Sequence, residues 1–158
     1  CGVCGKATLD SVFANFSAVS SSLKVSSALL QSLPDKLRAA QETFDQTGGL
    51  HASAIFDRDG NLLVLREDVG RHNALDKALG FCLRNKLLPL HDYILMVSGR
   101  VSFELMQKAL AGSIPIVAAI SAPSSLAVEF AKGSGQTLVG FLRGDRMNVY
   151  ANPERVTA

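Results

Sequence analysis

The sequence predicts an α/β protein with a mixed, mostly parallel sheet between layers of helices. A polar turn at residues 57–60 separates two short apolar segments, residues 52–56 and 62–65, a pattern typical of a β-hairpin. After the hairpin, short apolar strands alternate with segments of helical period. Because repeated βα units bury a parallel sheet between helices, these observations together define the fold class.

Each element is predicted from its local pattern. Leu33, Leu37, Ala40 and Phe44 share one helical face, so we expect a helix over residues 33–45 that ends before a glycine pair. The serine-rich residues 20–27 predict a polar, mobile loop, preceded by a short helix over residues 9–16. The remaining expected elements are helix 74–82, strand 93–97, helix 103–111, strand 116–120, helix 126–132 and strands 137–141 and 147–150.

Length and composition indicate one globular domain. The chain has 158 residues, of which 47% are hydrophobic and 19% charged. A net charge of +2 argues against general nucleic-acid or membrane binding, and no apolar run approaches the roughly 20 residues that span a bilayer. The first residue is not methionine, so we expect an amino-terminal part of a longer protein to be missing. Residues 1–25 are expected to form a flexible segment, and residues 26–158 the α/β domain.

A CxxC pair, Cys1 and Cys4, is the most reactive feature of the sequence. Two thiols at this spacing support each other's ionisation, and the thiolate is the form that attacks sulfur or binds metal. The third cysteine, Cys82, lies in an apolar run and is expected to be a small buried hydrophobe. The pair leaves a redox, a sulfur-handling and a mixed-ligand metal role open.

Small and basic residues follow three of the predicted strands, at residues 98–102, 121–125 and 142–146. Since the carboxyl ends of parallel strands meet, these loops should gather at one end of the sheet. Backbone N–H groups at helix starts and arginine side chains are good partners for phosphate. The loops therefore predict a site for a phosphate-bearing ligand, although Ser102 and Ser125 could instead be helix caps and the arginines solvated charges. No nucleotide-binding glycine motif supports an ATPase or a dinucleotide dehydrogenase.

A charged segment, residues 66–73, joins the hairpin to the next helix. A structural interpretation is favoured, in which Asp68 caps the turn and Glu67 forms surface pairs with arginines. Cys1, Cys4, His51 and His72 could in principle form a tetrahedral zinc site, but their spacing does not follow a zinc-finger pattern.

Several long motifs together resemble the FdhD family, the formate dehydrogenase accessory sulfurtransferases. The resemblance covers nearly the whole chain, and it is much more specific than the CxxC pair. The motifs are residues 1–6 (CGVCGK), 47–51 (TGGLH), 66–77 (REDVGRHNALDK), 97–104 (VSGRVSFE) and 121–127 (SAPSSLA).

The resemblance implies a cytidine-deaminase-like, three-layer αβα fold with a mixed sheet. It also implies a cytoplasmic sulfur carrier, which takes a persulfide from a cysteine desulfurase. The sulfur passes to the molybdenum or tungsten bis(molybdopterin guanine dinucleotide) cofactor before that cofactor enters formate dehydrogenase. Deaminases hold zinc with His-x-Glu and Pro-Cys-x-x-Cys at two helix starts. Here His72-Asn73-Ala74 and residues 122–125 lack the glutamate and both cysteines, so no metal is expected.

In this interpretation Cys1 carries the persulfide, while Cys4 resolves it, shares it or relays it. We expect the guanine dinucleotide end of the cofactor on the loop after the strand 137–141, and GDP to bind as a fragment of the cofactor. Arg143 and Arg146 would neutralise phosphate, and Asp145 would accept hydrogen bonds from guanine. The expected cofactor-binding residues are Phe141, Leu142, Arg143, Gly144, Asp145 and Arg146, assisted by Ser98, Gly99, Arg100 and Ser121.

Two other classes of function remain. A cofactor-binding chaperone would use the CxxC pair as a zinc or disulfide staple. A dithiol oxidoreductase would cycle the pair as a disulfide, although the CxxC does not open a helix directly after a strand, as it does in thioredoxins. We also expect a homodimer, with the desulfurase and formate dehydrogenase as protein partners.

Overall fold

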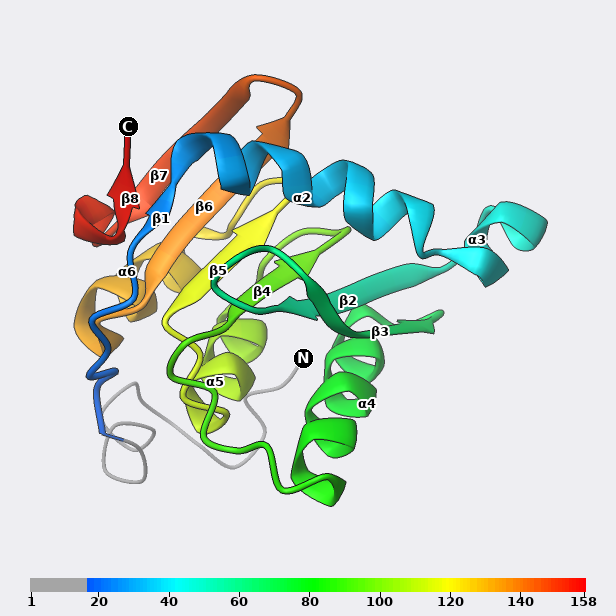
Figure 1. Ribbon diagram of the computed structural model, residues 1–158, viewed down its shortest axis with the longest axis horizontal. Helices are drawn as coiled ribbons and strands as arrows, with labels where there is room; N and C mark the ends of the chain where they lie inside the picture. Colours follow the sequence, from blue (N-terminus) through cyan, green and yellow to red (C-terminus); the bar gives the residue numbers. More distant parts are fainter. Residues whose placement is uncertain (1–16) are drawn as a thin grey trace.

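The computed structural model describes residues 17–158, so Cys1 and Cys4 lie outside the described residues. A six-stranded sheet of order β3-β2-β4-β5-β6-β7 forms the middle of three layers (Figure 1). Its strands are β2 His51–Phe56, β3 Leu62–Asp68, β4 Ile94–Val97, β5 Ile116–Ala119, β6 Thr137–Arg143 and β7 Arg146–Ala151. One face is covered by α2 (Ser27–Ala39), and the other by α4 (Arg71–Arg84), α5 (Phe103–Ala111) and α6 (Ser125–Ser134). The predicted fold class is confirmed.

Strand direction determines what lies at each end of the sheet. β4, β5 and β6 are parallel, whereas β2 pairs antiparallel with both β3 and β4. The carboxyl ends of β4, β5 and β6 therefore share one end of the sheet with the start of β2 and the end of β3. We call this the carboxyl end of the sheet. The last strand, β7, returns antiparallel to β6 as a hairpin, whereas the sequence had suggested a longer loop between two separate strands.

The alternation of side chains along the strands divides the interior into two cores. Leu95 and Val97 of β4 face the helices α4, α5 and α6, where Phe103 and Phe130 meet edge to face with ring centroids 5.1 Å apart. The alternate residue Met96 faces α2. Both faces of the central strands are buried, which explains why these strands are continuous apolar runs in the sequence.

The helix predicted over residues 33–45 is two helices. The first, α2, begins earlier, because the Ser26 hydroxyl accepts a hydrogen bond from the Leu29 N–H at 3.1 Å and caps it. Pro34 lies inside α2, although proline is more common in a first helical turn. The second helix, α3 (Glu42–Thr47), starts after a break and ends at Gly48, whose φ of 66° favours glycine.

The beginning and the end of the described chain pair with each other. Strand β1 (Val25–Ser26) lies parallel to β8 (Val156–Thr157), which a 3-10 helix, Pro153–Arg155, connects to β7. Leu23 is fully buried with the α2 core. Residues 25–27 were expected in a polar loop, and they instead form β1 and start α2. The division of the chain at residue 25 stays a prediction.

None of the helices within residues 17–158 has both the length and the apolar character needed to cross a membrane.

Candidate functional site

The three loops that were expected to converge lie together at the carboxyl end of the sheet. The Val101 N–H donates to the Ala122 carbonyl at 3.1 Å, and the Ser124 N–H donates back to the Val101 carbonyl at 2.9 Å. The third loop joins them through the Phe141 N–H, which donates to the Ser121 carbonyl at 3.2 Å. The loops therefore form one connected surface.

Arg143 connects the β6–β7 hairpin to this surface. Its Nε donates a hydrogen bond to the Ile120 carbonyl at 3.0 Å, and its side chain is exposed. Phe141 and Leu142 precede it in β6, and the turn consists of Gly144, with a φ of 55°, and Asp145. Arg143 can therefore present the rest of its guanidinium to a ligand beside Ile120.

Phe141 has an unusual backbone for a bulky residue. Its φ is 51°, in a region where the β6–β7 pairing is irregular, and 41% of its surface is exposed. Such strain in a non-glycine residue is uncommon and is found preferentially at functional sites. The neighbouring Leu142 is fully buried, so the bulge sends one apolar side chain into the core and the other to the surface.

The other expected residues divide between structural and exposed positions. The Ser98 hydroxyl accepts a hydrogen bond from the Ala52 N–H at 2.9 Å, which fixes the end of β4 against the start of β2. A side chain at Gly99 would place its Cβ 3.1 Å from Nδ1 of His51, so glycine permits the close approach of this loop to β2. Arg100 is exposed.

Several backbone N–H groups that could have bound an anion are used within the protein. The Val101 and Ser124 N–H groups hold the loops together, and the Ala127 N–H donates to the Ser124 hydroxyl at 3.2 Å. Ser124, and not Ser125, is thus the cap of α6. The backbone N–H groups named here are therefore not free to bind an anion, which leaves the arginine side chains as the groups that could do so.

His72 and Ser102 form a hydrogen-bonded pair that the sequence did not reveal. Nε2 of His72 lies 2.9 Å from the Ser102 hydroxyl and 4.0 Å from a Glu104 carboxylate oxygen. Burial, together with the nearby Arg71 charge, lowers the pKa of His72, so its imidazole is neutral at pH 7. His72 therefore contacts the start of α5. The comparison with deaminases had instead matched His72 with the helix start at residues 122–125.

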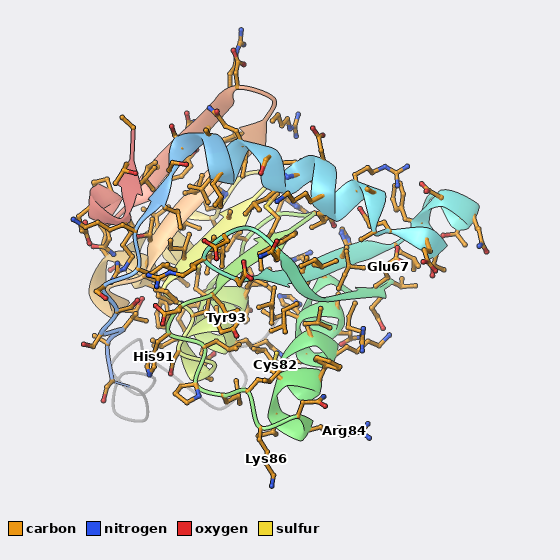
Figure 2. All side chains as sticks on the ribbon, in the orientation of Figure 1. Glu67, Cys82, Arg84, Lys86, His91 and Tyr93 are labelled. Carbon is orange, nitrogen blue, oxygen red and sulfur yellow. The ribbon has the colours of Figure 1, made fainter. Side chains whose placement is uncertain are left out.

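The acidic residues of the charged segment have structural roles, as expected, but among the described residues Glu67 accepts backbone hydrogen bonds instead of forming the expected pairs with arginines. The Glu67 carboxylate accepts hydrogen bonds from the Thr43 and Phe44 N–H groups, both at 2.9 Å, and so holds α3 against the hairpin (Figure 2). Asp68 binds the Lys77 ammonium and the Gly70 N–H. The Lys77 hydrogen bond is the main reason that the pKa of Asp68 falls to about 2.

A cavity of about 440 Å³ opens at the carboxyl end of the sheet, beside these loops. We call it the edge cavity. Ile120, whose carbonyl holds Arg143, is one of its walls, so the cavity adjoins the hairpin residues. Its lining residues are Arg38, Gln41, Phe44, Gly48, Gly49, Leu50, His51, Ser98 and Ile120. Gln41 was not predicted as a site residue, because it lies within the single helix that was expected over residues 33–45.

The described residues provide no metal site. Between residues 17 and 158 no group of three or more histidines, cysteines or acids is placed to hold a metal ion. Cys82 is buried on α4 (Figure 2), and burial raises the pKa of its thiol, as expected for an unreactive cysteine. The zinc alternative involves Cys1 and Cys4, outside the described residues.

Gly140 in β6 allows the loop after β5 to pack on the sheet. A Cβ at this position would lie 2.9 Å from Cδ of Pro123 and 3.2 Å from the Ser121 carbonyl oxygen. Gly140→Ala should therefore lower the free energy of unfolding by about 1–3 kcal/mol, the usual range for overpacking. Urea denaturation measures this change.

Gly80 provides the matched control, because a Cβ there contacts nothing within 4 Å. Gly80→Ala in the interior of α4 should stabilise the protein by roughly 0.5–1 kcal/mol. Equal effects of the two substitutions would contradict the close approach at Gly140.

Comparison with known proteins agrees with this architecture. The model of the FdhD/NarQ family matches residues 1–157. Proteins named sulfur carrier protein FdhD are similar over 99% of the chain: 55% identical in Mycolicibacterium paratuberculosis, 57% in Streptomyces coelicolor and 47% in Sulfolobus acidocaldarius. The chain spans 58%, 56% and 60% of the lengths of these relatives.

A solved structure has the same fold. It is described as a formate dehydrogenase accessory protein from Desulfotalea psychrophila, and it is 33% identical with a TM-score of 0.81. The match covers 89% of this chain and 60% of that one. The ordered motifs, the three-layer architecture and the family match over residues 1–157 lead to one conclusion: this chain belongs to the FdhD/NarQ family.

Proposed function

We propose that this chain is the catalytic part of a cytoplasmic sulfurtransferase that serves formate dehydrogenase. The observation that supports this most is its similarity, over 99% of its length, to proteins named sulfur carriers. In the proposed reaction a cysteine desulfurase donates sulfur, and the molybdenum bis(molybdopterin guanine dinucleotide) cofactor of formate dehydrogenase receives it as the substrate.

The loading step is a thiol–disulfide type of exchange. The Cys1 thiolate attacks the outer sulfur of the desulfurase persulfide, the sulfur–sulfur bond of the donor breaks, and the donor cysteine leaves as a thiolate. Cys1 then carries the outer sulfur as a persulfide. No net oxidation occurs, because one sulfur–sulfur bond replaces another.

Two reactions of the Cys4 thiolate with the Cys1 persulfide can follow, and each conserves atoms and electrons. Attack of the Cys4 thiolate on the outer sulfur moves the persulfide to Cys4 and frees Cys1. Attack on the Cys1 sulfur instead releases hydrosulfide and leaves a Cys1–Cys4 disulfide, which a cellular dithiol must reduce before the next cycle. In the second reaction, formation of the Cys1–Cys4 disulfide provides the two electrons that reduce the outer persulfide sulfur to sulfide.

The substrate end of the proposal uses the carboxyl end of the sheet. Arg143, tied to Ile120, and Arg146 would bind the diphosphate of the guanine dinucleotide, and Ser98, Gly99, Arg100 and Ser121 would shape the surface below it. The fit is supported by the exposed arginines and by the edge cavity, which provides concave volume next to Arg143.

Intact-protein mass spectrometry tests the sulfur-carrier proposal. The full-length protein is incubated with a cysteine desulfurase and cysteine, and it should gain the mass of a sulfur atom that a reducing agent removes. A protein that gains no labile sulfur under conditions in which the desulfurase turns over would exclude this function.

We also expect the protein to need no zinc, because the deaminase-type ligands are absent from the sequence. Metal analysis of the full-length protein purified without added zinc should find far less than one zinc ion per chain. Stoichiometric zinc that is lost on substitution of Cys1 and Cys4 would favour the chaperone with a zinc staple instead.

A further inference from the structure

We propose that the outer face of the second half of α4 is the docking surface for the cysteine desulfurase, and that it binds a segment of that protein in which carboxylates surround an apolar side chain. This inference rests on the proposed function, in which a desulfurase loads Cys1 with sulfur. It assigns the surface that receives the donor, and it places that surface away from the substrate loops.

Two hollows meet on this face of α4. The larger, of about 850 Å³, lies between α4 and β3, and its walls include Arg66 and Arg84. The smaller, of about 160 Å³, has only apolar walls, among them Leu88. Gly80 and Leu83 line both hollows, so the two adjoin along α4. We call the two hollows together the α4 groove.

The groove offers an apolar contact on a firm base. The side chain of Leu83 is 65% exposed, and three residues earlier Gly80 leaves open space, since nothing lies within 4 Å of a Cβ built on it. The Leu90 N–H donates to the Gly112 carbonyl at 2.9 Å, which holds the loop after α4 against the end of α5. An apolar side chain of a partner can therefore bury surface against Leu83.

The groove also carries positive charge that the protein does not neutralise. Its walls include three basic side chains, those of Arg66, Lys77 and Arg84. Its acidic wall residue, Glu67, already accepts hydrogen bonds from two N–H groups at the start of α3, and the neighbouring Asp68 pairs with Lys77. Arg66 and Arg84 therefore leave a positive charge over the groove.

A further basic side chain stands at the end of α4. Lys86 has a φ of 57°, a left-handed conformation that is uncommon for residues other than glycine, and the Leu87 N–H donates to the Cys82 carbonyl at 2.9 Å beside it. Figure 2 shows Arg84 and Lys86 at this end of the helix, both directed away from the body of the protein. Such a backbone in a non-glycine residue is found preferentially at functional sites.

The charge of the groove indicates its occupant. A second copy of the same face would bring like charges together, which disfavours an interface between two copies here. The side chains of residues 1–16 include one lysine and one aspartate, so this segment has no net side-chain charge to complement the groove. A partner that presents carboxylates around an apolar residue matches both the basic rim and the apolar hollow.

The position of the groove favours the sulfur donor. α4 begins at the carboxyl end of the sheet, where the substrate loops lie, and its last turn reaches the opposite end. There a third hollow, lined by Ser17 and His91, shares its wall residue Ala111 with the apolar hollow. Ser17 follows Cys4 by 13 positions (17 − 4), a span of at most roughly 43–47 Å. A donor in the groove is thus close to the point where the cysteine-bearing segment joins the domain.

Initial rates of sulfur loading test the assignment. The concentration of the full-length protein is varied over a fixed amount of a desulfurase that loads the wild type, and mass spectrometry of the labile sulfur gives kcat and KM. Arg84→Glu and Leu83→Ala should each raise KM at least about tenfold and leave kcat nearly unchanged, because they remove binding and no step of the chemistry. Added salt should raise the wild-type KM and narrow its difference from Arg84→Glu, since salt screens exposed charges.

Matched controls lie on α6, which covers the same face of the sheet. Leu126 is 40% exposed, and Lys132 lies in the last turn of α6, as Arg84 does in α4. Leu126→Ala and Lys132→Glu repeat the two types of substitution outside the groove. They should keep KM within about twofold of the wild type, as is usual for surface substitutions.

Lys86→Gly separates docking from folding. It removes a basic side chain from the groove, so it should raise KM. It also places glycine at a left-handed position after a helix, where glycine is favoured, so it should raise the melting temperature. A loss of docking through unfolding would instead lower the melting temperature together with the loading rate.

The outcomes separate this inference from the proposed function. If the wild type is loaded and both Arg84→Glu and Leu83→Ala keep its KM, the donor docks elsewhere and only the present assignment is wrong. Normal loading with loss of formate dehydrogenase activation would give the groove to the recipient, and a changed oligomeric state of Leu83→Ala would give it to a second copy; each overturns the assignment. If the wild type gains no sulfur from an active desulfurase, the proposed function fails as well.

Discussion

Cys1→Ala should abolish the labile sulfur that the wild-type protein gains from a cysteine desulfurase, and with it the activation of formate dehydrogenase. The reason is chemical: a methyl side chain can neither attack a persulfide nor hold one. Mass spectrometry of the intact full-length protein measures the sulfur, and a formate oxidation assay in cells that lack the endogenous protein measures the activation. We expect complete loss in both measurements.

Cys82→Ala is the control, since it removes a thiol that is fully buried. It should still gain the labile sulfur at the wild-type level, at a modest cost in stability from the small cavity it leaves. A Cys1→Ala protein that gains as much labile sulfur as the wild type would show that another cysteine carries it. Loss of sulfur in Cys82→Ala with an unchanged melting temperature would point to Cys82.

Arg143→Ala should weaken GDP binding by about 1.5–3 kcal/mol, the range for a hydrogen bond to a charged group, or about 10- to 150-fold in Kd. The guanidinium of Arg143 is already oriented by the Ile120 carbonyl, so little side-chain freedom is lost when phosphate binds. GDP should also bind more tightly than ADP. Calorimetry with both nucleotides measures these differences, and Arg143→Lys should give an intermediate Kd because it keeps the charge without the planar fork.

Arg58→Ala is the matched control for Arg143→Ala. Arg58 is an exposed arginine in the β2–β3 turn, at the opposite end of the sheet, so its removal changes the net charge equally. It should leave GDP affinity unchanged. Sulfur loading at Cys1 should survive both substitutions, because donor and substrate use different parts of the chain. Equal GDP affinities of the wild type and Arg143→Ala would move the diphosphate to another site.

The positions of the central strands along the chain could be predicted because each of these strands is a short apolar run between polar residues. The boundaries of α2 could not, since Pro34 resembles the start of a helix and the true cap, Ser26, stands in a serine-rich stretch. The β6–β7 hairpin was missed for a related reason. Gly144 and Asp145 are typical of any loop, and only the pairing of Arg143 with Arg146 shows that the turn is tight.

For the candidate site, the sequence predicted only which loops lie close together, because the direction of the strands brings these loops to the same end of the sheet. The convergence of Ser98, Ser121 and Arg143 follows from parallel strands, and the structure shows it. The contacts of individual side chains do not follow from such a rule. The pair of His72 and Ser102 joins residues 30 positions apart, and the place of Gln41 in the edge cavity depends on where α3 breaks from α2.

The parallel pairing of β1 with β8 has a consequence for how the chain folds. Val25 finds its strand partner only in Val156, so this contact spans almost the whole described sequence. During synthesis, α2 can form early, but β1 can pair only after β8 has left the ribosome. Contacts of such high sequence separation slow folding and close the domain last. Protection of the residue 25–26 amides from hydrogen exchange would therefore report the final, cooperative step in the maturation of the domain.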